Sequence, residues 1–581
     1  MFLVDCLSYF CYNSLEGCDF MAFDGIIASS VVNELNNALN NSRIEKIYMP
    51  TKNEIILIFH SNREKLKLLI SIDASNARFH FTKQTRENPI KAPQFCMVLR
   101  KYIQGAKILN VFQYGLDRVI SLELENINEL GDLVKYKLYI ELMGKYSNII
   151  LVNNDNKILD SIRHVDYTMS SIREVLPARE YILPSTLDKN EFLGMDFDQF
   201  TANLQLASMD PFFSAENMAK IIANQFVGFS KTFIENLLGF CNITNTFNKE
   251  NTTKLFNTIN LVIYNIKENL VNLKTYGKDY HIDLTNFLTN SEHTPISNFL
   301  DEFYSSKESA QALKTAKFNL QKDVLNFRCK YEKNLKRVNE ILEDAYEMEK
   351  YKLYGELISS NIYRMSLGMK EITLENYYDN NKPVTIPLKE NFSPSRNAQA
   401  YFKKYNKLKN AITHANIQKE DYEKNINYLE SVIFLISEAS SLAELENIKF
   451  ELSEAGYIKM ATGKKKYRDE ISLPPFSYTF EGIEILVGRN NLQNDKLTLK
   501  DARKNYTWLH TKDVHGSHVI IKSENVPENV LEYAAKLAVK HSQAKDSSKV
   551  SVDYTLVKFV HKPNGAKPGK VIYTNYKTII I

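Results

Sequence analysis

The sequence predicts an α+β protein of several domains: an N-terminal mixed-sheet domain, a helical domain, a long antiparallel coiled coil and a C-terminal α+β domain. Its 581 residues exceed the usual length of one domain, about 100–200 residues. Six short runs rich in alternating and β-branched residues precede residue 153. Two later stretches, 311–358 and 402–436, keep an apolar spacing of three and four residues over many turns.

The N-terminal domain is expected to span 21–189. Gly25 to Leu39 has helical periodicity, and Phe95 to Ile103 predicts a second, shorter helix. Strands are predicted at 44–48, 54–59, 66–72, 119–124, 137–142 and 148–152. Residues 1–20 lack a basic segment, and Met21 opens a run typical of a natural N-terminus. We therefore expect 1–20 to be a mis-called extension.

A helix-hairpin-helix domain is expected over 190–295. Val227 to Thr232 forms a glycine-containing turn that leads into an apolar helix. Such a turn can offer backbone N–H groups to a phosphate. An ordinary turn between two helices explains the same residues at least as well, so the residues alone leave the choice open.

A coiled-coil arm with a non-helical middle is expected over 296–450. The two heptad-like stretches can fold back on each other as antiparallel helices, each reaching roughly 60 Å at 1.5 Å per residue. Pro383, Pro387 and Pro394 interrupt the segment between them. An arm of this kind serves either as a spacer or as a strut that docks on a partner. The candidate docking residues at the start of the returning helix are Arg396, Lys403 and Lys404.

The C-terminal domain, expected over 451–581, contains polar clusters between β-branched runs, and the single Trp of the chain lies among them. Polar and aromatic residues on loops and strand ends suggest a recognition surface. Turns with satisfied polar side chains are the alternative. No catalytic site can be built from these groups. The candidate recognition residues are Arg489, Asn490, Asn491, Trp508, His510, His515, Ser517 and His518.

The charge is unevenly distributed along the chain. From Tyr457 to the end there are 21 Lys and Arg against 12 Asp and Glu, a balance of +9, whereas the whole chain carries +4. A basic module on a mildly acidic body favours a polyanionic partner, most simply nucleic acid. A solvated Lys-rich surface would give the same count.

Several classes of protein are disfavoured by what the sequence lacks. The six Cys show no metal-binding spacing and suit free thiols in a reducing compartment. No run approaches the roughly 18 apolar residues of a membrane span, and no signal peptide is recognisable. Walker and His-Glu-x-x-His motifs are absent. We expect a cytoplasmic protein without metal, cofactor or membrane anchor.

Several motifs, in the order in which they occur along the chain, resemble those of the NFACT family of ribosome-associated quality-control factors. Bacterial members of this family are often labelled fibronectin-binding proteins. The resemblance extends over 21–581. It rests on the C-terminal motifs around Arg489, Trp508 and Lys567, and on the runs Met21–Gly25, Gly115–Arg118, Glu141–Leu151 and Arg396–Lys409.

The resemblance implies an N-terminal NFACT-N domain, a helix-hairpin-helix domain, the coiled coil and a C-terminal NFACT-R domain. It implies a factor that binds large ribosomal subunits obstructed by peptidyl-tRNA and recruits tRNA, alanyl-tRNA in bacteria. Such a factor supports mRNA-independent alanine tailing of the stalled chain. Asp117 and Arg118 match the family's Asp-Arg pair, implicated in tRNA recognition; a structural ion pair is the alternative. The full set of implied tRNA-binding residues is Asp24, Asp117, Arg118, Glu141 and Lys145.

The chain departs from the family pattern at Lys145, where we expect Arg. Lys keeps the positive charge but lacks the bidentate fork of a guanidinium, which puts a role of this position in doubt.

Two rival functions are possible for such a chain. A fibronectin-binding surface adhesin is disfavoured by the missing signal peptide and disulfide framework. A DNA glycosylase, which the N-terminal domain of the family resembles, would need Pro-Glu after the first Met, whereas Ala22-Phe23 follow Met21. We expect a non-enzyme.

Overall fold

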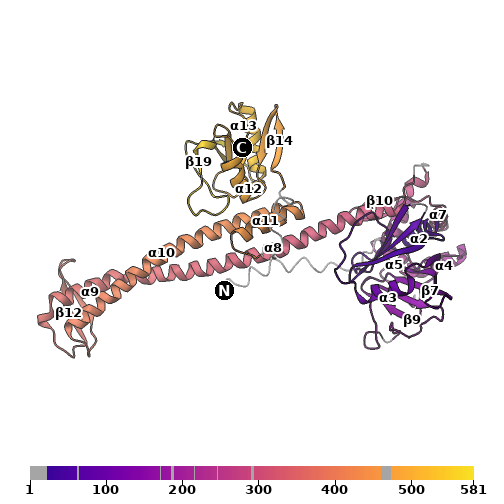
Figure 1. The fold of residues 1–581 in the computed structure, drawn as a ribbon, viewed down its shortest axis with the longest axis horizontal. Helices are drawn as coiled ribbons and strands as arrows, with labels where there is room; N and C mark the ends of the chain where they lie inside the picture. The colour runs from indigo at the N-terminus through magenta and orange to yellow at the C-terminus, as the bar shows by residue number, and fades with distance from the viewer. Residues whose placement is uncertain are drawn as a thin grey trace. The chain divides into compact units, whose positions relative to one another are not determined.

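The computed structural model describes residues 23–61, 64–170, 172–184, 189–214, 216–244, 247–288, 293–459 and 473–581. The predicted extension 1–20 and Met21 lie outside these residues. The chain divides into two compact units, 1–308 and 309–581, and each is described by itself. The predicted α+β class is confirmed, since each unit combines helices with a large sheet (Figure 1).

A nine-stranded sheet organises the first unit, in the order β4-β3-β2-β1-β5-β6-β7-β8-β9. All pairings between its named strands are antiparallel, so the sheet is not the mixed sheet that we predicted. Most neighbours follow each other through short turns, which join antiparallel strands only. The strands are β1 (Arg43–Thr51), β2 (Glu54–Ser61), β3 (Glu64–Ser71), β4 (Arg78–Phe81), β5 (Lys107–Gln113), β6 (Val119–Ile127), β7 (Leu133–Glu141), β8 (Asn148–Asn153) and β9 (Ile158–Ser161).

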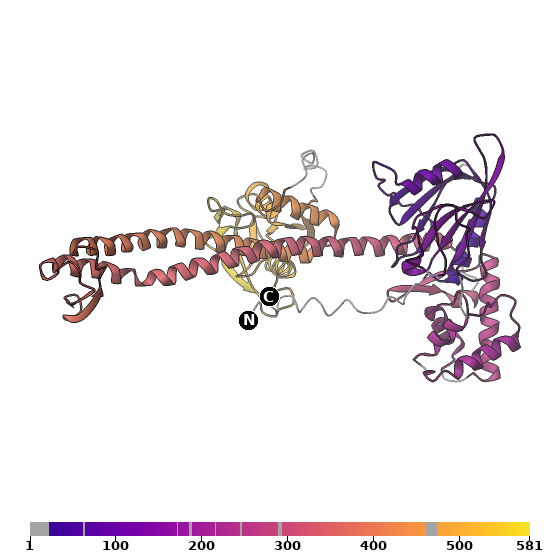
Figure 2. The same ribbon diagram turned by 90° about the horizontal axis from the view of Figure 1, so that it is seen from below.

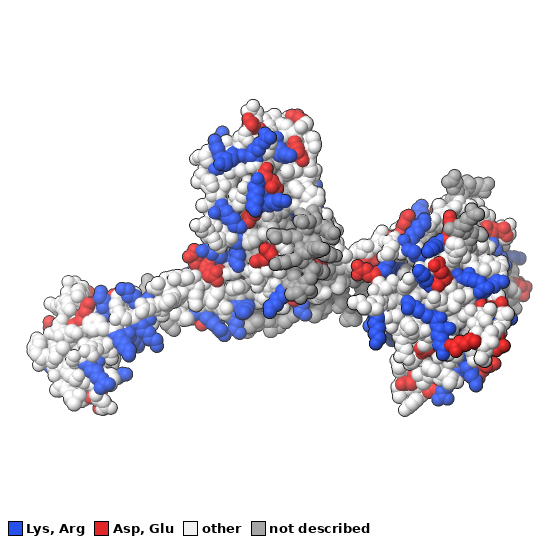
Figure 3. Space-filling model, viewed as in Figure 1, with Lys and Arg blue, Asp and Glu red and all other residues white. Residues whose placement is uncertain are grey.

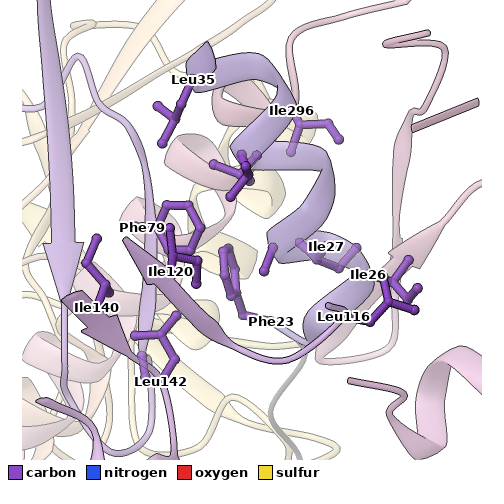
Figure 4. Close-up of a cluster of buried hydrophobic side chains, with 14 of the residues drawn as sticks. Phe23, Ile26, Ile27, Leu35, Phe79, Leu116, Ile120, Ile140, Leu142 and Ile296 are labelled. Atoms are coloured by element: carbon purple, nitrogen blue, oxygen red, sulfur yellow. The ribbon is translucent and has the colours of Figure 1, made fainter. Parts of the chain in front are cut away.

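Helix α2 (Gly25–Leu39) forms the centre of the core of this unit, and α3 (Gln94–Ile103) covers β1. The residues of α2 at helical spacing, among them Ile26, Val31 and Leu35, are buried. Phe23, just before the helix, packs edge-on against Phe79 at 5.3 Å between ring centroids. Figure 4 shows Phe23 beside Phe79 and Ile26 beside Leu116, which comes from the turn between β5 and β6.

Four helices complete the first unit after the sheet: α4 (Phe197–Ser208), α5 (Met218–Gln225), α6 (Lys231–Cys241) and α7 (Lys249–Lys267). A hairpin of β10 (Leu273–Tyr276) and β11 (Asp279–Ile282) follows. α5 and α6 are joined by the turn in which we predicted a helix-hairpin-helix, and buried Phe192, Phe200 and Phe226 pack the group together.

The first turns of helix α8 (Ile296–Asp344) are anchored to the edge strand β4. Asp301 accepts from the Thr82 hydroxyl at 2.5 Å and from the Lys83 amide at 2.9 Å. Arg78, 1% exposed, pairs with Glu308 at 2.5 Å and lies 4.1 Å from the centroid of the Tyr304 ring. A buried Arg requires such partners because an unpaired buried charge is costly.

The helical arm of the second unit is the antiparallel coiled coil that the spacing predicted. α8 leads through α9 (Met348–Ser360) to the hairpin of β12 (Glu371–Asn376) and β13 (Lys382–Pro387), and α10 (Pro394–Glu438) returns. The Lys317 ammonium donates to the Ser437 carbonyl at 2.8 Å, and the Tyr331 and Tyr422 rings lie 5.8 Å apart. Figures 1 and 2 both show α10 alongside α8.

Helix α11 (Leu442–Glu454) follows the arm, and the C-terminal domain packs on it. The sheet of this domain has the order β14-β15-β17-β16-β18-β21. Its strands are β14 (Phe476–Phe480), β15 (Ile483–Val487), β16 (Thr507–Thr511), β17 (Val519–Ile521), β18 (Ser551–Leu556) and β21 (Lys577–Ile580). None of the helices in the described part of the chain combines the length and the apolar character that a membrane span requires.

α13 (Glu528–Lys540) covers one face of the C-terminal sheet. The other face carries α12 (Asn491–Lys496), the helical turn Leu497–Asp501 and the short pair β19 (Val560–His561) and β20 (Ile572–Tyr573). Trp508 is the largest side chain buried on this second face.

Candidate nucleic-acid interface

Three segments far apart in sequence meet at the start of α2. The Gly25 amide donates to the Gly228 carbonyl at 2.9 Å. A Cβ on either glycine would lie 1.8 Å from the Leu116 carbonyl oxygen, closer than any real contact. The Gln113 amide bridges the carbonyls of Gly25 and Asp117 at 2.9 Å each. Glycine is therefore required at 25 and 228, because only a backbone without Cβ permits this approach.

Asp24 joins the N-termini of two helices at this point. Its Oδ1 accepts from the Ile27 amide at 2.9 Å and so caps α2. Its Oδ2 accepts from the Ser230 hydroxyl at 2.5 Å, and Ser230 in turn caps α6 by accepting from the Phe233 amide. Burial raises the pKa of Asp24 to about 6, against the opposing effects of Ser230, the helix amides and Arg118.

Asp117 and Arg118 directly follow Leu116 in the turn between β5 and β6. The Asp117 Oδ1 accepts from the Arg118 amide at 2.7 Å. Burial lowers the pKa of the Arg118 guanidinium, whereas Asp117 and Asp24 oppose that shift. The pKa of Lys189 is also lowered, by burial and then by Arg118. The Asp-Arg pair thus lies half-buried beside two helix N-termini, with a second cation close by.

Glu141 and Lys145 differ in their exposure to solvent and in the residues that they contact. Glu141 is fully buried, pairs with Arg173 and accepts from the Tyr181 hydroxyl at 2.8 Å. We therefore expect Glu141 to hold these side chains in place without touching RNA itself. Lys145 is exposed, and its ammonium lies 4.9 Å from the centroid of the exposed Tyr146 ring.

The arm candidates are all exposed near the turn at its far end. Arg396 lies over the Phe392 ring at 4.3 Å, and the Lys404 ammonium lies 3.9 Å from the centroid of Tyr351. Lys403 is exposed beside them. Figure 3 shows Lys and Arg side chains gathered on this end of the arm. These contacts hold the cations in place while leaving their charges on the surface.

The aromatic and His candidates of the C-terminal domain do not form an exposed surface. Trp508 is 0% exposed, and Ser517 and His518 are also buried. The rings of His510 and His518 pack on Trp508, and burial lowers their pKa values to about 4 and about 3. They are therefore neutral near pH 7 and carry no charge for a phosphate. The surface predicted from Trp508, Ser517 and His518 is corrected: these residues form core.

The remaining motif residues face the domain's own helical arm. Arg489 pairs with Glu444 of α11, and its Nε donates to the Pro474 carbonyl at 2.7 Å. Asn490 caps α12 by accepting from the Gln493 amide at 2.8 Å. Asn491 donates to Glu451 through its amide at 3.0 Å and its side chain at 2.9 Å. His515 lies 3.9 Å from Glu430 of α10.

Glu451 lies at the centre of this contact, which we call the seam: Arg489, Asn491 and His515 against Glu430, Glu444 and Glu451. Glu451 is 0% exposed and also accepts from the Tyr428 hydroxyl at 2.9 Å. Burial raises its pKa to about 7, despite the donors from Asn491, Tyr428 and Leu492. The polar motif therefore serves first to seat the C-terminal domain on α10 and α11.

Sequence reasoning missed Ser230 and Lys189 in the first unit and Glu444 and Glu451 in the second. Ser230 lies 206 residues from its partner Asp24, and no local pattern connects the two. The Glu residues lie in an ordinary helix. In the described part of the chain, no group of three or more His, Cys, Asp and Glu side chains is placed to hold a metal ion.

Comparisons with known families match both units. The model of the NFACT N-terminal and middle domains matches residues 24–470. The model of the NFACT protein RNA binding domain matches residues 475–575. The two matches together extend over nearly all described residues.

Similar proteins come from several organisms. The Rqc2 homolog RqcH of Bacillus subtilis is 36% identical over 571 residues, covering 97% of this chain and 98% of its own. The Rqc2 homolog RqcH of Streptococcus pneumoniae (strain D39) is 34% identical, covering 96% and 97%. The human ribosome quality control complex subunit NEMF is 26% identical over 159 residues, covering 27% of this chain and 14% of its own.

A solved structure of the N-terminal part of the fibronectin/fibrinogen-binding protein from Streptococcus suis is 29% identical, covering 49% of this chain and 99% of its own. The TM-score between the two structures is 0.40.

Proposed function

The chain belongs to the NFACT family, and on that premise we propose that it binds obstructed large ribosomal subunits and recruits tRNA for mRNA-independent alanine tailing of stalled nascent chains. Its partners would be the large subunit, peptidyl-tRNA and alanyl-tRNA, in the cytoplasm. Family membership and the RNA-binding domain support the ribosomal assignment. Peptide-bond formation would remain with the ribosome, so the chain would act by binding and positioning.

The observation that carries the tRNA part is the placement of Arg118. Its guanidinium is close enough to Asp117 and Asp24 for both carboxylates to influence its pKa, at the point where α2 and α6 begin. Carboxylates restrain an Arg while leaving some donors for a base edge or a phosphate. Helix N-termini add positive potential that attracts phosphate. The site is therefore suited to recognise RNA.

Lys145 and Tyr146 extend this proposal to a second point of the same domain. Both side chains are exposed, and a Lys beside an aromatic ring suits a phosphate next to a stacked base. The Arg163 guanidinium holds the turn around Lys145 by donating to the Lys145 carbonyl at 2.9 Å and to the Ser147 carbonyl at 3.2 Å. The fibronectin-binding alternative finds no specific support in the described residues, and we do not propose it.

Sequencing the RNA that copurifies with the full chain tests the proposal. We expect large-subunit rRNA and tRNA, with alanine isoacceptors enriched over their cellular share, and little small-subunit rRNA. Equal recovery of both subunits' rRNA would contradict binding to obstructed large subunits. Large-subunit rRNA without tRNA would contradict only tRNA recruitment.

A further inference from the structure

The C-terminal sheet has two ends with different surroundings. β15 ends at Val487 beside the start of β17 at Val519, and β16 ends at Thr511 beside the start of β18. The loops at this end supply the seam, because Arg489 follows β15 and His515 lies between β16 and β17. The opposite end, where Thr507 pairs with Leu556, points away from these contacts.

Basic side chains gather at that opposite end. Lys504 comes shortly before β16, and Lys558 follows β18. The Lys558 amide donates to the Lys504 carbonyl at 3.0 Å, which joins the two segments. α12 begins at the seam and continues through Leu497–Asp501 toward the same end. The exposed cations of this region, which we call the distal shelf, are Lys496, Lys500, Arg503, Lys504 and Lys558.

The burial pattern explains why the shelf is one-sided. Asn494, Leu497 and Thr498 point into the domain, whereas Lys496 and Lys500 are exposed on the other side of the same turns. Residues four apart lie on one face of a helix. The shelf has two acidic neighbours in sequence, Asp495, which pairs with Lys562, and Asp501. Figure 3 shows basic side chains on the part of the C-terminal domain away from the arm.

The shelf cations differ from other cations of the domain in their partners. Lys522, Lys536 and Lys562 form ion pairs with Glu484, Glu532 and Asp495. None of the five shelf cations forms an ion pair with an N···O distance of 4.0 Å or less to a residue that the structure describes. Arg503 and Lys558 lie near the Tyr506 and Phe559 rings at 5.8 and 4.9 Å. Gathered cations without internal partners repel one another, so a polyanion that neutralises them is favoured.

We propose that the distal shelf is the surface with which the C-terminal domain binds the phosphate backbone of RNA. This deepens the proposed function, on which it rests, and it moves the RNA contact away from the seam motif. Lys side chains act as point charges on phosphates and read no base sequence. The seam holds the domain on the arm with the shelf facing outward, so one end seats the domain while the other binds.

The test uses the full chain and a fluorescent 20-nucleotide RNA hairpin of arbitrary sequence. The shelf variant is Lys500→Ala with Lys504→Ala and Lys558→Ala. The control is Lys512→Ala with Lys540→Ala and Lys549→Ala, three exposed Lys in the loops and helix end at the seam end of the sheet. Both variants lose the same charge, and unchanged thermal midpoints would show that both fold.

The shelf variant should bind the hairpin roughly tenfold to hundredfold more weakly, and the slope of log affinity against log salt should shrink by about 2–3. The control should stay near wild type. Equal weakening of both variants, or wild-type affinity of the shelf variant, would overturn the shelf. Equal competition by polyglutamate and by RNA would also overturn it, as a general anion patch. Copurification of large-subunit rRNA, measured separately, would then still decide the proposed function.

Discussion

Gly228 shows how one missing side chain determines the candidate tRNA site. Its φ is +76°, and an added Cβ would lie 1.8 Å from the Leu116 carbonyl oxygen. A backbone atom cannot move aside as a flexible side chain can. The turn before α6, and with it Ser230 and its bond to Asp24, depends on this approach.

Gly228→Ala should therefore destabilise the first unit by at least about 3 kcal/mol, the sum of left-handed strain and overpacking. Gly277→Ala is the matched control, because Gly277 also has a positive φ, +59°, but nothing lies within 4 Å of its added Cβ. It should cost only about 1 kcal/mol. Chemical denaturation of both variants measures the difference. Similar losses would show that the crossing at Leu116 imposes no constraint.

Glu451 makes the seam sensitive to pH. Its pKa is about 7 in the seam, above the ordinary Glu value of 4.5. The folded state therefore keeps the proton between about pH 4.5 and 7, where the unfolded state has lost it. Stability falls as pH rises through this window and stays lower above it.

Glu451→Gln removes this titration, since an amide keeps a similar shape and stays neutral. The variant should gain stability relative to wild type as the pH rises from 5 to 8, by on the order of 1–3 kcal/mol. Thermal midpoints of the C-terminal transition across that range give the comparison, and subtracting the variant's curve cancels other titrating groups. Parallel curves for both proteins would contradict burial of a titrating Glu451.

At the scale of elements, the sequence predicted those helices and strands whose apolar pattern is visible in the segment itself. The helix expected at 25–39 is α2, and six expected strands overlap β1, β2, β3, β6, β7 and β8. β4 was missed because Arg78 and His80 interrupt its apolar pattern, and both are buried through distant partners on α8. β5, β9 and the arm-end hairpin were missed too. Short strands are recognisable mainly by their neighbours in the sheet.

The same limit applies to the candidate sites. Asp117 and Arg118 came from the family resemblance, and the structure places them with Asp24. The C-terminal motif was expected to be a surface, yet Asn491 and Arg489 contact Glu451 and Glu444. A sequence gives the polar residue but not the buried group that satisfies it. The distal shelf lacks any motif, so only the fold brings Lys500 and Lys558 to one end.

The arm allows a direct test of docking. Lys317 contacts Ser437, and Tyr331 contacts Tyr422, so Lys336 lies near Gln418 on the returning helix. Deleting 337–417 through a short Gly linker removes the basic end with Arg396, while the seam residue Glu430 remains. Both units should stay folded, and cosedimentation with large ribosomal subunits should fall at least tenfold, because a preordered arm binds with little ordering cost.

The control for the deletion keeps the arm and removes only its charges: Arg396→Ala with Lys403→Ala and Lys404→Ala. An intermediate loss is expected from this variant. A folded deletion protein that cosediments as well as wild type would show that the arm is a spacer.

At the scale of the whole molecule, three candidate RNA-binding surfaces serve one proposed task. The Asp-Arg site lies on the first unit, and the arm end and the distal shelf lie on the second. Each surface is exposed or half-buried, and each is held by neighbours that leave cationic groups at the surface. We therefore expect separable functions: tRNA capture by the first unit, and subunit docking and RNA backbone contact by the second.

The proposed role of Asp117 and Arg118 in tRNA capture is measured by the ratio of tRNA to large-subunit rRNA that copurifies with the double variant Asp117→Ala with Arg118→Ala. The matched control is Glu129→Ala with Lys135→Ala, an acid and a base exposed at the β6–β7 turn of the same sheet. We expect the first variant to lose at least nine-tenths of its tRNA while its rRNA is unchanged, and the control to keep both. Equal tRNA recovery from the first variant and wild type would contradict it.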